Sequence, residues 1–182
     1  LAETGNAQFG GEPGLSDRYL ASLWWMDQLG LLARHHHDVV VRQTLAGLNY
    51  QLVRSDTLEP LPDYWASLLF KRLMGPEVLR PKVEGPRAAR VYAHRRPDGQ
   101  GFTFLLVNLD PERALVARLP RGGGELYAVT GPDLFGTEVW LNGEVLAQPA
   151  PDALPDLSGE PLDGAEVTVQ PLSFTFATFL EL

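Results

Sequence analysis

Residues 38–43 read Asp-Val-Val-Val-Arg-Gln, and this short β-branched run stands between two segments with helical periodicity. Such a run is typical of a strand buried on both faces of a parallel sheet. Apolar residues recur at helical spacing before the run and again from Pro62 to Gly75. We therefore predict a helix, a parallel strand and a second helix in succession.

The first helix has recognisable end signals. Ser16 is a favourable N-cap, because its hydroxyl can accept a hydrogen bond from a backbone N–H of the first turn. Gly30 is expected to end the main helix, with residues 31–37 forming a further turn. The expected buried face comprises Leu20, Leu23, Trp24 and Leu31.

The chain opens on Leu1-Ala2-Glu3-Thr4, which resembles the end of another strand before a loop of small residues. The second helix would start near Pro62 and stop at Gly75-Pro76, since proline suits a first turn and cannot continue a helix. The order strand end, helix, strand, helix is how a (β/α)8 TIM barrel finishes. We assign residues 1–76 to the C-terminal part of such a barrel.

Residues 77–182 have no long helical period and are punctuated by turns. The expected strands are residues 78–83, 89–94, 102–108, 114–119, 125–130, 138–141, 166–169 and 173–180. Asn142-Gly143 is a strong hairpin signal. Several short strands at turn-punctuated intervals predict a β-sandwich domain. The expected fold class is therefore α/β plus all-β.

The composition excludes some classes of protein. The formal net charge is -8, which argues against a nucleic-acid binder because that class presents a basic face. It does not exclude an anionic ligand, since a cleft can be locally positive, and Arg34, Arg42, Lys71 and Arg72 all lie in the first half. The chain has no cysteine, so disulfides and cysteine metal sites are excluded.

Targeting signals are absent from the printed sequence. No basic segment followed by an apolar one opens the chain, and no apolar run is long enough to cross a membrane. Lack of cysteine is compatible with an extracellular location, because a domain of adequate size needs no disulfide. We expect a secreted or periplasmic bacterial protein.

Glu3 is a candidate for chemistry because it follows a strand end and precedes a glycine-rich loop, a position that faces the mouth of a barrel. It could be a nucleophile, a base or a metal ligand, or simply a solvated side chain. The run His35-His36-His37 suggests a metal, but consecutive residues cannot all point the same way, so a polar turn is the better interpretation. We expect neither a metal nor a cofactor.

Four further residues are candidates for ligand binding. Gly10 and Gly11 resemble part of an anion-cradling loop, although most glycine pairs are only turns. Gln43 is a polar residue at the predicted strand end. Tyr50 could contact a sugar through both its ring and its hydroxyl, or could be a packing residue. These residues alone do not select a reaction.

The pattern as a whole resembles the heparanase-like glycoside hydrolases, glycoside hydrolase family 79. The resemblance is dense up to about Gly75 and thinner afterwards. It rests on residues 1–4, 10–11, 13, 15–17, 27–31, 33–34, 39–43, 49–50, 61–65, 67–71, 141–143 and 171–174. It implies a (β/α)8 barrel with a β-sandwich, cleavage of β-linked glucuronic acid with retention of configuration, and Glu3 as the nucleophile.

The resemblance also implies ligand roles for the other candidates. Gly10, Gly11 and Tyr50 would help to hold the uronate carboxylate, with Gln43 near the same sugar. Phe9 departs from the pattern, because the mammalian enzyme has a glycine there. The loop before Asn49-Tyr50 is about one residue shorter as well.

A retaining glycosidase needs a second carboxyl group as acid/base, about 5–5.5 Å from the nucleophile. The resemblance implies that this residue lies on an earlier barrel strand, so we expect an N-terminal portion of the same enzyme to supply it. The first hypothesis is a retaining endo-β-glucuronidase acting on heparan-sulfate-type or heparin-like polysaccharide. The alternatives are an exo-β-glucuronidase of the same family and, in another class, a non-catalytic carbohydrate-binding or accessory domain.

Overall fold

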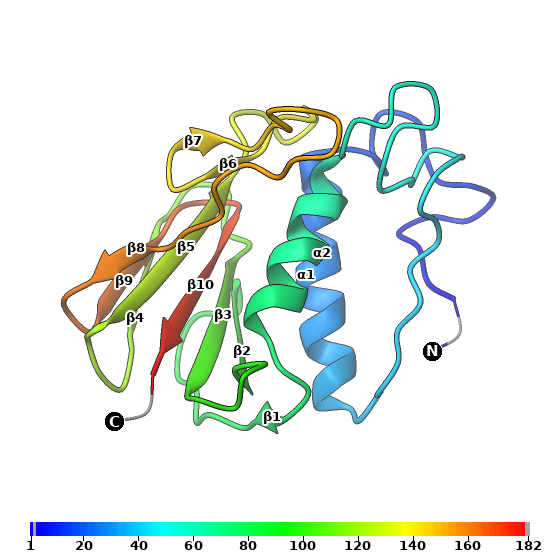
Figure 1. Ribbon diagram of the computed structural model, residues 1–182. Helices are drawn as coiled ribbons and strands as arrows, with labels where there is room; N and C mark the ends of the chain where they lie inside the picture. The colour runs from blue at the N-terminus through cyan, green and yellow to red at the C-terminus, as the bar shows by residue number, and fades with distance from the viewer. Residues whose placement is uncertain (2, 181–182) are drawn as a thin grey trace.

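The computed structural model of the protein describes residue 1 and residues 3–180, so Ala2 of the opening segment lies outside the described residues. Two helices come first and the strands follow (Figure 1). The helices are α1 (Tyr19–Arg34) and α2 (Pro62–Leu73). The strands are β1 (Val78–Leu79), β2 (Ala89–Arg95), β3 (Phe102–Asn108), β4 (Leu115–Arg118), β5 (Gly124–Thr130), β6 (Trp140–Leu141), β7 (Glu144–Val145), β8 (Glu160–Leu162), β9 (Glu166–Val169) and β10 (Ser173–Phe179). The strand-rich second half predicted from the sequence is confirmed.

The larger sheet is antiparallel and is centred on β10. Its strand order is β1-β2-β3-β10-β5-β6-β7, and β8 also pairs with β5. Along β10, Phe176 lies opposite Leu105 of β3 and Tyr127 of β5. Every residue of β10 is buried because both faces of this part of the sheet are covered.

The two faces of the larger sheet carry different layers. On one face, Phe174 and Phe176 share a core cluster with Leu23 and Met26 of α1 and Leu69 of α2. On the other face, residues of β3 and β10 pack against the small antiparallel sheet of β4 and β9, for example Phe179 near Val167. Figure 1 shows the helices on one side of the larger sheet, with the N-terminal segment beyond them.

The predicted parallel strand over residues 38–43 is wrong in extent, because the described residues form one parallel bridge there, between Thr4 and Arg42. Backbone hydrogen bonds flank this bridge, from Thr4 N to Val41 O at 2.9 Å and from Gln43 N to Thr4 O at 3.0 Å. A buried parallel strand needs a neighbour on each edge and cover on each face. Among the described residues, this segment forms that one bridge and further hydrogen bonds to Leu1, and Val39 remains 65% exposed.

The end signals predicted for α1 also need correction. The helix begins at Tyr19 after Arg18, with no side-chain cap, because the Ser16 hydroxyl instead accepts a hydrogen bond from Glu12 N at 2.8 Å. Gly30 does not end the helix, which continues to Arg34. Gly30 faces β2 at close range, since a Cβ there would lie 2.3 Å from the Tyr92 ring.

Candidate functional site

Glu3 lies in the segment that runs beside residues 39–43, and its side chain is exposed. Leu1 and Thr4 fix this segment, through hydrogen bonds from the Leu1 backbone nitrogen to Val39 O at 2.9 Å and from Gln43 N to Thr4 O at 3.0 Å. The two predicted strand ends are therefore neighbours in space. Glu3 stands immediately before the bridge that holds them together.

The glycine-rich loop packs on the segment that carries Asn49 and Tyr50. Gly10 and Gly11 have φ values of +96° and +89°, a region that glycine adopts without strain. The backbone N–H of Asn49 donates to Gly10 O at 2.7 Å, and its side-chain amide donates to Gly11 O at 3.1 Å. Asn49 thus connects the two segments through two hydrogen bonds. The sequence motif alone did not predict this role.

Tyr50 explains why the loop needs glycine. A Cβ on Gly11 would lie 2.7 Å from Cδ1 of Tyr50, and a Cβ on Gly5 would lie 3.4 Å from its Cε1. The phenol of Tyr50 donates a hydrogen bond to Oε1 of Gln43 at 2.9 Å. Gly10, Gly11, Gln43 and Tyr50 are therefore brought into one connected group. Phe9 does not join this group, because its side chain projects fully into solvent.

A buried ion pair lies beneath this group. The Arg42 guanidinium is 2.5 Å from Oδ2 of Asp63 in the first turn of α2, and Oδ1 of Asp63 accepts a hydrogen bond from Ser22 of α1 at 2.9 Å. Burial raises the pKa of the Asp63 carboxyl, while the Arg42 charge and the hydrogen bonds from Arg42 and Ser22 oppose this rise. Its position near the predicted start of α2 indicated a helix-start residue, and the buried ion pair is an additional role that local sequence does not predict.

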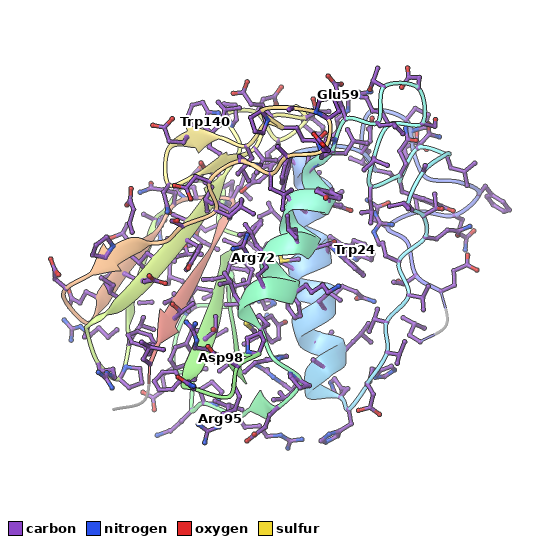
Figure 2. All side chains as sticks on the ribbon, viewed as in Figure 1. Trp24, Glu59, Arg72, Arg95, Asp98 and Trp140 are labelled. Atoms are coloured by element: carbon purple, nitrogen blue, oxygen red, sulfur yellow. The ribbon has the colours of Figure 1, made fainter. Side chains whose placement is uncertain are left out.

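Aromatic rings enclose the Arg42 guanidinium. Its Cζ lies 5.7 Å from the Trp24 ring, 5.4 Å from the Trp25 ring and 5.7 Å from the Tyr50 ring. Figure 2 shows Trp24 reaching from α1 away from the large sheet, toward the segment that follows the helix. The ion pair therefore joins the helices to the predicted ligand-binding residues.

The histidines lie apart from this group. His35, His36 and His37 are exposed at the end of α1, where a guanidinium nitrogen of Arg80 is 2.8 Å from Nε2 of His36. Within the part of the chain that the structure describes, no three His, Asp or Glu side chains are grouped to hold a metal. Neither described helix is long and apolar enough to cross a bilayer.

Several curated proteins are similar to this chain over nearly all of its length. Heparanase of Mus musculus is 38% identical over 192 residues, covering 97% of this chain and 36% of its own length. Baicalin-beta-D-glucuronidase of Scutellaria baicalensis is 34% identical over 183 residues, covering 97% and 35%. Heparanase-like protein 1 of Arabidopsis thaliana is 41% identical over 122 residues, covering 67% and 22%. The chain thus spans about a third of the length of the first two relatives.

Solved structures resemble the fold at much lower sequence identity. An arabinofuranosidase matches all of this chain and 42% of its own, with a TM-score of 0.70 and 18% identity. A glycoside hydrolase family 30 subfamily 8 xylanase from Clostridium acetobutylicum matches the same shares with a TM-score of 0.66 and 7% identity. These likenesses concern the fold alone.

No protein-family profile matches the chain. Matches over 97% of this chain to heparanase and to baicalin-beta-D-glucuronidase, at 38% and 34% identity, nevertheless establish the relationship. The chain belongs to the heparanase-like family.

Proposed function

We propose that the full-length protein is a retaining endo-β-glucuronidase that hydrolyses β-glucuronide linkages in heparan-sulfate-type polysaccharide, with Glu3 as the nucleophile. The observation that carries the proposal is the placement of Glu3 directly before the Thr4–Arg42 bridge, next to the connected group of Gln43, Tyr50, Gly10 and Gly11. The family relationship supports a glycosidase acting on glucuronides.

The proposed reaction has two steps. The Glu3 carboxylate attacks the anomeric carbon and forms a glycosyl ester, while a second carboxyl group protonates the leaving oxygen. That group then removes a proton from water, which attacks the ester, releases Glu3 and yields a product of unchanged anomeric configuration. We propose that an N-terminal portion of the same enzyme supplies this acid/base.

The substrate's uronate would be held beside the Tyr50 ring. Backbone N–H groups of a glycine loop can approach a carboxylate closely, and Gly10 and Gly11 both adopt positive φ values that glycine tolerates without strain. In this structure the Gly11 N–H donates to Gln8 O at 3.2 Å, so the loop would adjust when the carboxylate binds. The Tyr50 hydroxyl, already directed at Gln43, would share its hydrogen bonding with the sugar.

The domain division and location belong to the same proposal. Residues 1–76 would be the last part of a (β/α)8 barrel and residues 77–182 a β-sandwich formed by the two antiparallel sheets. The likeness to glycoside hydrolase structures over the whole chain supports this division. We also propose a secreted or periplasmic location, where a polysaccharide substrate is accessible.

An exo-acting β-glucuronidase is the second candidate, and the similarity to baicalin-beta-D-glucuronidase favours it. Size-exclusion chromatography of heparan sulfate during digestion separates the two. An endo enzyme lowers the mean chain length early, whereas an exo enzyme releases free glucuronic acid while the polymer size stays nearly constant.

The central experiment compares Glu3→Gln with Glu12→Gln in the full-length protein. Glu12 is the matched control, because it is an exposed carboxylate on the neighbouring loop. We expect Glu3→Gln to abolish turnover of heparan sulfate and of an aryl β-glucuronide while saccharide binding persists, and Glu12→Gln to remain active. Unchanged hydrolysis by Glu3→Gln would contradict the nucleophile and favour a non-catalytic, accessory role for this region.

A further inference from the structure

The Arg42–Asp63 pair is almost completely withdrawn from solvent. The two side chains are 5% and 4% exposed, and their charged groups are 2.5 Å apart. Such a pair adds little net stability on average, because removing both charges from water opposes their mutual attraction. Apolar residues of similar volume often serve a core equally well or better. A stability role alone therefore gives no reason for an ion pair at this position.

Arg42 also contacts two of the proposed substrate-binding residues. One guanidinium nitrogen donates to the backbone oxygen of Gln43, while the other faces Asp63. The guanidinium lies 5.7 Å from the centre of the Tyr50 ring, and Tyr50 in turn donates to Gln43. Arg42, Gln43 and Tyr50 thus form a closed set of contacts, in which moving one residue moves the others.

The planar fork of arginine suits this arrangement. Two nitrogens at fixed separation can serve two acceptors at once, whereas a lysine has one nitrogen on a flexible stem. Arg42 Nε is buried and finds no hydrogen-bond acceptor among residues 1 and 3–180, and an unsatisfied donor carries an energetic cost. The guanidinium is oriented so that it contacts Gln43, Tyr50 and Asp63, even though this orientation leaves its Nε–H without an acceptor among the described residues.

Asp63 connects this set to both helices. It lies in the first turn of α2 and accepts the Ser22 hydroxyl of α1. The Arg42 guanidinium also lies within 5.7 Å of Trp24 and 5.4 Å of Trp25 on α1. Residues of both helices thus contact one side of the guanidinium, and Gln43 and Tyr50 contact its other side.

We propose that the Arg42–Asp63 pair is a positioning element that fixes Gln43 and Tyr50 for recognition of the uronate sugar. This inference rests on the proposed glucuronidase function and adds a residue pair that does not itself touch the substrate. Misplacing a substrate-contacting group by about 1 Å can lower the rate by roughly a hundredfold, so the pair controls activity through geometry. It should affect glucuronides more than glucosides, because Tyr50 lies beside the proposed uronate site.

The test uses the full-length enzyme with three variants, Arg42→Met, Arg42→Lys and the double variant Arg42→Met with Asp63→Leu. The double variant removes both charges, so its stability should recover toward that of the parent even if Arg42→Met alone folds poorly. The matched control is Arg118→Met with Glu166→Leu, which removes an exposed pair 2.9 Å apart on β4 and β9. The readouts are the melting temperature and kcat and KM for an aryl β-glucuronide and the corresponding β-glucoside.

We expect the double variant to melt near the parent temperature and to lose about a hundredfold in kcat/KM for the glucuronide. Its preference for glucuronide over glucoside should fall by about tenfold, which corresponds to the loss of one well-placed hydrogen bond to a charged group. Arg42→Lys should keep the stability but not the preference, because one nitrogen cannot reach both acceptors. The Arg118–Glu166 control should change neither kinetic quantity.

Two outcomes would overturn parts of this picture separately. If the parent is active and the double variant retains its kcat/KM and its glucuronide preference, the positioning role is wrong while the glucuronidase proposal stands. If the parent hydrolyses no β-glucuronide, the proposed function itself fails, and the positioning role fails with it.

Discussion

The phenol oxygen of Tyr50 lies 2.9 Å from the side-chain oxygen of Gln43 and donates a hydrogen bond to it. Seven positions separate the two residues along the chain, and the loop between them contains residues at positive φ. A Cβ added to Gly11 would lie 2.7 Å from the Tyr50 ring and one added to Gly5 3.4 Å from it, so the ring leaves little room beside the glycine loop. Tyr50 thus lies beside the glycine loop, the Gln43 side chain and the buried Arg42 guanidinium at once.

Removing the Tyr50 hydroxyl should weaken sugar binding with little loss of fold. In Tyr50→Phe the ring still packs against Gly11, but Gln43 loses its donor, so we expect kcat/KM for an aryl β-glucuronide to fall about tenfold. Steady-state kinetics measure the change. Tyr127→Phe is the control, because that hydroxyl donates to Glu125 at 2.9 Å on β5, and it should leave kcat/KM unaltered.

A methyl group on Gly11 should disrupt the site more than one on Gly14. Both glycines have positive φ, so alanine carries a similar backbone strain of about 1–2 kcal/mol at either position. At Gly11 the new Cβ would also lie 2.7 Å from the Tyr50 ring, whereas at Gly14 nothing lies within 4 Å. We expect Gly11→Ala to lose both stability and glucuronide turnover, and Gly14→Ala to lose stability only. Equal kinetics for the two variants would contradict the assigned contact.

Gly30→Ala should destabilise the protein, although alanine usually stabilises a helix interior by about 1 kcal/mol relative to glycine. The added Cβ would lie 2.3 Å from the Tyr92 ring, so the helix or the strand must shift. We expect a net loss of about 1–3 kcal/mol in urea unfolding. In a Tyr92→Ala background the same change should become neutral or favourable, and a persistent loss there would show that the ring is not the cause.

The stability should depend on pH through His94. Burial lowers the pKa of this imidazole, while its hydrogen bond with Gly75 O opposes the effect. The unfolded state therefore binds a proton at His94 more tightly than the folded state does. The contribution of neutral, buried His94 to the free energy of unfolding is complete above the unfolded pKa of about 6.5 and is lost as the pH falls from there through the lower folded pKa. His94→Asn retains an amide donor for Gly75 O without a titrating ring. We expect unfolding free energies measured between about pH 5 and 8 to fall less steeply with acid in this variant.

Both helices and most strands could be anticipated from local patterns. Apolar spacing predicted α1 and α2, and the hairpin signal at Asn142-Gly143 coincides with the turn between β6 and β7. The strand at residues 38–43 could not be foreseen correctly from its composition. A β-branched run reports a preference for extended backbone, whereas strand formation depends on which neighbours are there to pair with it.

The candidate site was anticipated unevenly. Gly10, Gly11, Gln43 and Tyr50 were named from the family pattern, and the structure brings them into contact. The partnership of Arg42 with Asp63 was not foreseen, because 21 positions separate them and nothing local links them. The preference of helix ends for glycine predicts an end at Gly30, but glycine stands there because it faces the Tyr92 ring, 62 residues later in the chain, a contact that periodicity does not encode.

The contacts between α1 and the large sheet have a consequence for laboratory recombination of related enzymes. A crossover near residue 76 would join the helices of one parent to the strands of another. Such a chimera would fold only if residues that pack together on the two sides of the junction remained compatible. One such pair is Gly30 with Tyr92. A second set is Tyr19 with Val129 and Gly131 at the end of β5. Libraries that exchange these pairs as units should yield more folded recombinants than libraries that cut between them.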